Sequence, residues 1–252
     1  MDRFGKDVIT MKHPLRLFSL AIVSILLLAV RSLAMDTGEY FTDPSAVVLA
    51  NAAADGDTKA IDRALANGAS PNAAGKDGMT PVIWALINQS PDGFKYLVAH
   101  GGNPNLSLSD GRSAMSLAAM HEKPEYLRAA LDHGGDPNLP NSQDNGFTPI
   151  YYAILALRTE NVGLLIKGGA NLNWKSSSGE TPLMLAAVTN RYDLVFEMLQ
   201  AGADPTVTNT HGRTILTIIR RIRTDPASEM GSWRTKVINL LQEKGLDVEN
   251  GQ

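Results

Sequence analysis

Two series of glycines recur through the chain at nearly constant spacing, and this repeat constrains the fold more than any other feature. The first series advances in steps of 33, 33, 35, 33 and 43 residues and consists of Gly68, Gly101, Gly134, Gly169, Gly202 and Gly245. The second advances in steps of 33, 35, 33 and 33 residues and consists of Gly78, Gly111, Gly146, Gly179 and Gly212. Because the two series keep step with each other, the sequence predicts an array of similar units.

Each unit has room for two short helices. Three units carry a helix-start signal, Thr80-Pro81, Thr148-Pro149 and Thr181-Pro182, and two more have only the hydroxyl residue, Ser113 or Thr214. The hydroxyl caps free backbone N–H groups, and proline is tolerated at the first helical position because no hydrogen bond is lost there. Small residues follow these starts and let neighbouring helices approach closely. The second helix is apolar at helical spacing and ends at a first-series glycine, which can close it in the left-handed conformation.

An extended link joins each second helix to the next unit. The links lead to Asp77-Gly78, Asp110-Gly111, Asn145-Gly146, Ser178-Gly179 and His211-Gly212. Since Asp-Gly and Asn-Gly are strong turn formers, each link is predicted to be an extended finger with a tight turn at its tip.

These units resemble the ankyrin repeat family, which has a 33-residue unit, a Thr-Pro helix start and a second helix closed by glycine. The resemblance implies an all-α fold, an ankyrin-repeat solenoid of about six helix-turn-helix units joined by extended β-turn fingers. The units are expected at about 44–74, 75–107, 108–142, 143–175, 176–208 and 209–252. The histidine that the family often places three residues after the threonine is replaced, and its customary hydrogen bond is expected to be lost. The replacements are Ile83, Ser116, Tyr151, Met184 and Thr217.

Two irregularities interrupt the repeat. The segment Leu139 to Asp144 makes its finger two residues longer, so this finger is expected to project further or to bend. The last unit carries ten extra residues around Thr224 to Trp233. These residues have two interpretations, a modified end unit that meets water or a loop that contacts a partner through Trp233.

The first 34 residues have the pattern of a signal peptide. A basic stretch from Met11 precedes the uncharged segment Leu17 to Val30, and cleavage is expected after Ala34. The uncharged segment would span only about 21 Å as a helix, against a hydrocarbon core of about 30 Å. The alternative is an uncleaved signal anchor. Translation is expected to begin at Met1 or Met11, and residues 35–43 form a short leader before the repeat domain at 44–252.

Charge and composition exclude several classes of protein. Residues 35–252 hold 18 Lys and Arg against 24 Asp and Glu, which disfavours a nucleic-acid partner. The chain has no cysteine, so a disulfide-stabilised fold, a thiol nucleophile and cysteine-ligated metal are excluded. No stable membrane span is expected after cleavage.

Catalytic and cofactor motifs are not found in the sequence. The five histidines lack metal-ligand spacing, and there is no Gly-x-Ser-x-Gly elbow or glycine-rich phosphate loop. His100 and His133 each precede a first-series glycine, where a cation complements the helix C-terminus. Asp77, Asp110 and Asp136 are interpreted as turn residues. We therefore expect no enzyme activity, no cofactor and no metal.

The resemblance implies a long concave surface made of finger tips and the ends of the first helices. The residue directly before each helix start differs in size and charge from unit to unit. Among these residues, Phe147 and Met79 are expected to be exposed, and with Arg112 they would supply the aromatic, methionine and arginine contacts that are enriched at interfaces. Each residue taken singly is better interpreted as solvated surface, whereas the set taken together favours binding. The predicted partner-binding residues are Lys76, Asp77, Met79, Asn88, Asp110, Arg112, Met120, His121, Asn145, Phe147, Leu155, Ser177, Glu180, Val188, Thr189, Arg213, Arg221 and Trp233.

The sequence therefore predicts a periplasmic protein-binding module, acting as a monomer or in a 1:1 complex. It is similar to exported immunity proteins that neutralise antibacterial toxins, including lipase effectors of type VI secretion systems. The alternatives are a periplasmic scaffold for a resident enzyme, such as a stress-defence enzyme, a structural or host-directed secreted protein, and an enzyme with an unrecognised site. Met35 directly follows the cleavage site, and initiation there would give a second, cytosolic form.

Overall fold

The computed structural model describes residues 36–222 and 224–248, and the predicted signal peptide with Ala34 and Met35 lies outside these ranges. Within them the chain forms thirteen α-helices and one 3-10 helix, η1, and the extended segments make only isolated β-bridges. No helix in the described ranges is long and apolar enough to cross a membrane.

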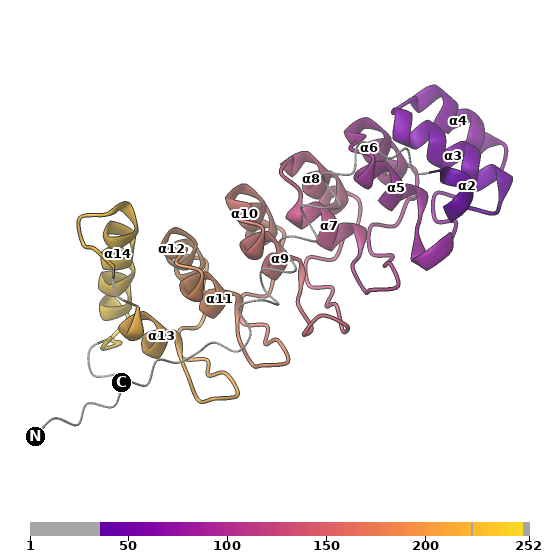
Figure 1. Cartoon of the computed structure of the whole chain (residues 1–252). Coiled ribbons are helices and arrows are strands. Elements are labelled where there is room, and N and C mark those ends of the chain that lie inside the picture. Colours follow the sequence, from indigo (N-terminus) through magenta and orange to yellow (C-terminus); the bar gives the residue numbers. More distant parts are fainter. Residues whose placement is uncertain (1–35, 223, 249–252) are drawn as a thin grey trace, which may run out of the picture. The chain divides into compact units, whose positions relative to one another are not determined.

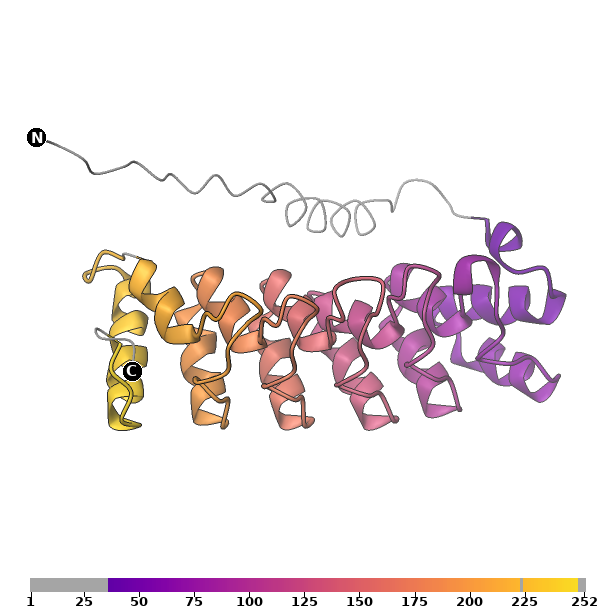
Figure 2. The same ribbon diagram turned by 90° about the horizontal axis from the view of Figure 1, so that it is seen from below.

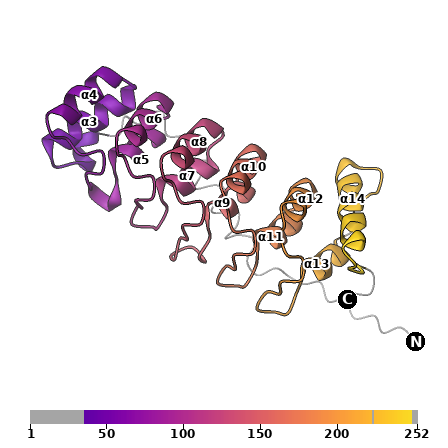
Figure 3. The ribbon, with the colours of Figure 1, turned by 180° about the vertical axis from the view of Figure 1, so that it is seen from behind.

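A short helix, α2 (Thr37–Tyr40), is followed by six helix pairs that stand side by side in chain order (Figures 1 and 3). The pairs are α3 (Pro44–Asp55) with α4 (Thr58–Ala66), α5 (Pro81–Ile87) with α6 (Pro91–Ala99), α7 (Ala114–Met120) with α8 (Pro124–Asp132), α9 (Pro149–Leu155) with α10 (Thr159–Lys167), α11 (Pro182–Val188) with α12 (Tyr192–Gln200), and α13 (Ile215–Arg221) with α14 (Glu229–Glu243). Figure 2 shows the same row from below. This arrangement confirms the predicted solenoid of helix pairs joined by extended fingers, one of which contains η1 (Lys76–Gly78).

The first helices begin largely as the sequence predicts. The Thr80 Oγ1 atom accepts a hydrogen bond from the Ile83 backbone N–H at 3.2 Å, and the same bond is made by Ser113, Thr181 and Thr214. Thr148 makes no such bond, although it precedes a proline as Thr80 and Thr181 do. The capping prediction is therefore wrong for Thr148 alone among the five helix starts.

The core lies between the helix pairs and depends on small side chains in the first helices. Ala85, Ala118, Ala153 and Ala186 are fully buried, and α3 contacts α5 as α7 contacts α9. The apolar side chains of the second helices close the core from the other side, as Phe94 does with no exposed surface. Burial of this apolar surface is the main force that joins one unit to the next.

Residues 36–43, expected to be a leader ahead of the repeat domain, pack against the first complete finger. Asp36 caps α2, and Phe41 is buried with its ring 5.9 Å from the ring of Trp84. The Tyr40 carbonyl oxygen and the Phe41 ring approach Gly75 so closely that a Cβ atom there would lie 2.5 Å from that oxygen. The segment thus packs against the finger that precedes α5 and against Trp84 on α5.

The glycines of both series are favoured by their backbone conformation, and Gly78, Gly111 and Gly179 of the second series also have no room for a Cβ atom. Every member of both series has a positive φ, between 68° and 95°. A Cβ atom added at any first-series glycine would meet nothing within 4 Å, so the backbone conformation alone favours glycine there. At Gly179, by contrast, a Cβ atom would lie 2.8 Å from the Thr210 backbone nitrogen of the next finger. Gly212 of the second series has a similar φ of 68° but nothing within 4 Å.

Gly179 and Gly212 therefore form a matched pair. We expect Gly212→Ala to lower the free energy of unfolding by about 1–2 kcal/mol, because alanine must adopt a left-handed conformation. Gly179→Ala is expected to lose about 1–3 kcal/mol more, because its Cβ displaces the following finger. Urea unfolding followed by circular dichroism measures both; equal losses would show that finger contact does not constrain Gly179.

Candidate protein-binding surface

The fingers are tied to one another by asparagine side chains. The Asn105 amide donates to the Gly134 carbonyl oxygen at 2.9 Å, and its Oδ1 atom accepts from the Asp136 backbone N–H at 2.8 Å. Asn72 and Asn138 make the same pair of bonds, and Asn173 accepts from the next finger in the same way. Each asparagine thus fixes the position of the finger that follows.

The finger tips are also joined to one another. The Ser109 N–H donates to the Asp77 carbonyl oxygen at 2.8 Å, and the Ser177 N–H donates to the Asn145 carbonyl oxygen at 2.8 Å. The Thr210 N–H continues the row with a 3.1 Å bond to the Ser178 carbonyl oxygen. The fingers therefore present a connected row of tips whose side chains are held in register.

The longer finger bends against the preceding finger. Its Asn141 is buried and donates to the Asp110 carbonyl oxygen at 3.2 Å, while Gln143 Nε2 donates to the Ser109 carbonyl oxygen at 2.8 Å. Asn141 and Asp144 also bond to the Tyr152 hydroxyl, at 3.0 and 2.9 Å. The extra residues therefore connect the finger to α9, and burial raises the pKa of Tyr152.

Most of the predicted partner-binding residues are accessible on the finger tips and the ends of the first helices; we call this set the palm. The exposed ones are Lys76, Asp77, Asn88, Asp110, Asn145, Ser177, Val188, Arg213 and Arg221. The half-buried ones are Arg112, Met120, Leu155, Glu180 and Thr189; Trp233 is also half-buried but lies on α14, outside the palm. Arg112 is further restrained because its guanidinium forms a 2.6 Å ion pair with Asp110.

The predicted exposure of Phe147 and Met79 is wrong. Their exposed fractions are 7% and 6%. The Phe147 ring stacks on Tyr151 with centroids 4.7 Å apart and meets Tyr152 edge-on at 6.1 Å. The residue before the helix start thus faces partly inward, and a large apolar side chain there joins the core.

His121 is also buried, against the prediction that it faces a partner. The loop after α7 does not enter the left-handed conformation used by Gln89, Leu157 and Asn190 in other units, and His121 is extended. Its ring lies 4.4 Å from the Tyr126 ring, and its Nδ1 atom accepts from the Lys123 N–H at 3.0 Å. The different loop conformation turns the imidazole into the protein.

Three replacements of the family histidine make hydrogen bonds of their own. Ser116 Oγ and Thr217 Oγ1 donate to the carbonyl oxygens three residues earlier, at 2.9 and 2.7 Å. The Tyr151 hydroxyl lies 2.8 Å from the Trp174 carbonyl oxygen and 2.7 Å from that of Glu180. Tyr151 therefore links α9 to the next finger, and burial raises its pKa.

The extra residues of the last unit fold back on α14. Ser228 caps this helix, and its Oγ atom donates to the Asp225 carbonyl oxygen at 2.6 Å. Trp233 lies 5.8 Å from the ring of Phe196 on α12, and Lys236 Nζ lies 4.0 Å from the Trp233 centroid. These contacts hold the start of α14 against α12 and leave Trp233 half-exposed, so both interpretations of the extra residues stay open.

Comparisons with known proteins agree with this geometry. The family model described as ankyrin repeats (3 copies) matches residues 49–141 and 115–209. The chain belongs to the ankyrin repeat family. A solved structure described as EF0377, an ankyrin repeat protein, is similar over 79% of this chain and 98% of its own, with 23% identity and a TM-score of 0.64. No curated protein sequence matches.

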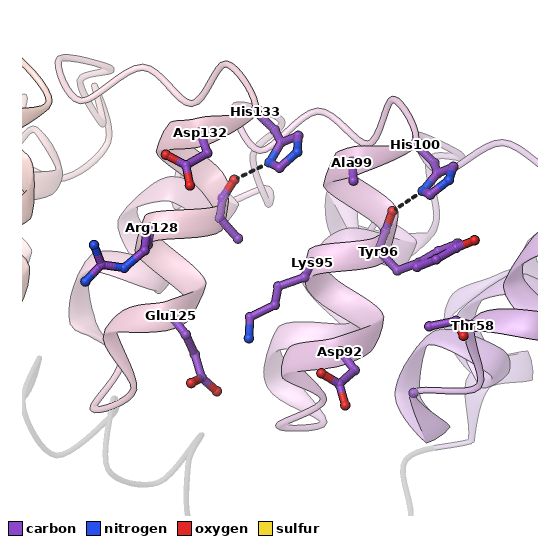
Figure 4. Close-up of a pocket in the computed structure, with 12 residues that line it drawn as sticks. Thr58, Asp92, Lys95, Tyr96, Ala99, His100, Glu125, Arg128, Asp132 and His133 are labelled. Carbon is purple, nitrogen blue, oxygen red and sulfur yellow. Dashed lines mark hydrogen bonds between the residues drawn. The ribbon is translucent and has the colours of Figure 1, made fainter.

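A groove of about 740 Å³ lies away from the ankyrin fingers, on the second helices α6 and α8 (Figure 4). His100 and His133 lie at its rim, where each ring Nδ1 is within 2.9 Å of the carbonyl oxygen four residues earlier. This confirms their predicted place at helix C-termini. No group of three or more potential metal ligands occurs in the described ranges.

Sequence reasoning missed Leu157 and Met230, which are exposed and apolar beside the palm. The sequence could have identified Leu157, because the equivalent positions in other units hold Gly56, Gln89 and Asn190. A leucine is unusual where the backbone is left-handed.

The burial of His121 predicts a specific sensitivity to acid. Burial lowers the pKa of His121; nearby Lys123 and Arg158 lower it further, while Glu122 and Glu125 oppose this shift. As the pH falls below about 6.5, the unfolded chain therefore binds more protons than the folded chain, and the free energy of unfolding decreases. We expect His121→Gln to reduce the loss of unfolding free energy between about pH 7 and pH 5. Urea titrations at several pH values measure this; an unchanged loss would contradict the assignment.

Proposed function

We propose that this ankyrin-repeat protein binds another protein through the palm and acts outside the cytoplasm. The observation that carries the proposal is the palm itself, where exposed side chains of different charge and size stand on fingers already joined by hydrogen bonds. Because the fingers are ordered before binding, little conformational entropy is lost when a partner docks.

The palm has chemical variety along its length. Asp77 and Asp110 are exposed on the first fingers, Leu155 and Val188 provide apolar surface in the middle, and Arg213 and Arg221 are exposed in the last unit. Neither arginine forms an ion pair within the described residues. Such a surface suits one partner in one orientation, since complementary charges select the partner and fix its register.

We further propose that the partner is an antibacterial effector, with a lipase-type toxin as the first candidate. The support is the signal-peptide pattern of the first 34 residues and the similarity to exported immunity proteins. Neutralisation would be steric, with the palm covering the entrance to the toxin's active site or the surface that meets lipid. A standard interface buries about 1,600 Å², which several adjacent units can supply.

Purification of the mature chain from its own cells, followed by identification of bound proteins, tests the partner class. A lipase-type toxin supports the immunity role. A resident enzyme, such as a catalase, would instead support the scaffold role and contradict neutralisation.

The palm is tested by reversing charge at its C-terminal end. We expect Arg213→Glu combined with Arg221→Glu to weaken binding of the purified partner at least about tenfold, because favourable charge pairs become repulsive. Lys167→Glu, an exposed change on α10, is the matched control and should bind normally. Calorimetry measures affinity and circular dichroism checks folding. Full affinity in the double variant would place the partner on another surface.

We also propose a cytosolic form that begins at Met35. The contacts of Asp36 and Phe41 begin after this residue, so a chain started there keeps the packing of residues 36–43. Replacing Met35 by leucine, with export retained, should remove the cytosolic form from immunoblots of fractionated cells. An unchanged cytosolic amount would contradict internal initiation.

A further inference from the structure

Each of the last three units has an exposed apolar side chain in, or directly beside, the loop that connects its two helices. Four large hydrophobic side chains are exposed in the described ranges: Val48, Leu157, Val188 and Met230. The last three belong to the α9–α10 loop, the end of α11 and the start of α14. We call residues 155–159, 188–193 and 229–233 the loop edge. It shares Leu155, Val188 and Thr189 with the palm but contains no finger residue.

Leu157 is costly for the isolated protein in two ways. Its φ is 59°, a left-handed conformation that costs a residue other than glycine about 1–2 kcal/mol. Its side chain is also 60% exposed, so packing within the chain does not offset the backbone strain. A strained and exposed leucine is explained if it contacts another molecule.

The loop edge ends in a small pocket between α12 and the extended start of α14. The pocket has a volume of about 240 Å³ and is lined by Asn190, Arg191, Tyr192, Asp193, Glu229, Met230 and Trp233. Arg191 is neutralised by Asp193 through a 2.6 Å ion pair. The exposed Glu229 forms no ion pair within the described residues, so the pocket has a free negative charge beside an aromatic ring.

We infer that the loop edge binds an amphipathic helix of another protein, with a basic side chain at the end that enters this pocket. Packed helices lie about 8–10 Å apart, so the exposed apolar side chains of successive units are expected to be separated by about that distance along the array. Seven residues of an α-helix rise about 10.5 Å, so apolar side chains seven residues apart can meet successive units. A lysine or arginine beyond the last of them would face Glu229 and Trp233.

This inference is tested separately from the proposed palm function, because the varied residues Leu157 and Glu229 do not belong to the palm. Palm variants such as Arg213→Glu with Arg221→Glu therefore leave it intact, and loop-edge variants test it alone. The partner helix is defined by its apolar spacing and its basic end.

The probe is a synthetic helical peptide of about 20 residues with leucines at seven-residue spacing and a terminal lysine. Fluorescence anisotropy of the labelled peptide, titrated with the full chain, should show saturable binding. A peptide of the same composition with the leucines redistributed around the helix should bind at least about tenfold more weakly. Equal binding of both peptides, or no saturable binding, would overturn the inference.

The decisive variant is Leu157→Asn, because asparagine tolerates the left-handed conformation and occupies the same register at position 190. We expect it to weaken peptide binding at least about fivefold while leaving the thermal midpoint unchanged or higher. Val48→Thr, at an exposed apolar position far along the chain, is the control and should bind normally. A lower midpoint in Leu157→Asn would show that Leu157 is structural and would overturn the inference.

Glu229→Gln tests the basic end of the peptide. It should weaken the lysine-ended peptide but leave a peptide ending in glutamine unaffected, because only the charge pair is removed. An equal effect on both peptides would contradict placement of the basic side chain in the pocket.

Discussion

The array depends on a hydrogen-bonded bridge that is repeated from finger to finger. An asparagine in one link donates to the carbonyl oxygen of the glycine that closes the next unit's second helix, and accepts from a backbone N–H two residues later. These backbone groups lie at a helix end, where intrahelical partners run out. The bridge satisfies them and aligns the fingers, while apolar packing between the helices supplies most of the stabilisation.

The places where the repeat is broken carry the features that distinguish this chain. Asn141 and Gln143 turn the long finger toward its neighbour, and Leu157 puts an exposed apolar side chain where other units have a residue suited to a left-handed backbone. The extension of α14 adds Met230 and Trp233 beside α12. The regular positions maintain the stack, so the irregular positions are free to specify contacts.

The sequence predicts the stack well because its signals are local. Glycine conformation, proline at helix starts and alanine between helices each follow from the residue and its spacing. The burial of Phe147, Met79 and His121 is not predicted, because it depends on neighbours in space: Phe147 stacks on Tyr151, and His121 follows a loop that turns toward Tyr126. The pocket at Trp233 could not be predicted, since it needs the relative placement of α12 and α14.

The asparagine bridge ends at Thr206, whose hydroxyl and N–H bond to Asp204 within its own finger. The last unit keeps the finger-tip bonds of Thr210 to Ser178 and is otherwise joined to its neighbour by helix contacts, including the rings of Phe196 and Trp233. Apolar association weakens as water is cooled. The final joint lacks the asparagine bridge, so a larger part of its strength comes from an interaction that cooling weakens.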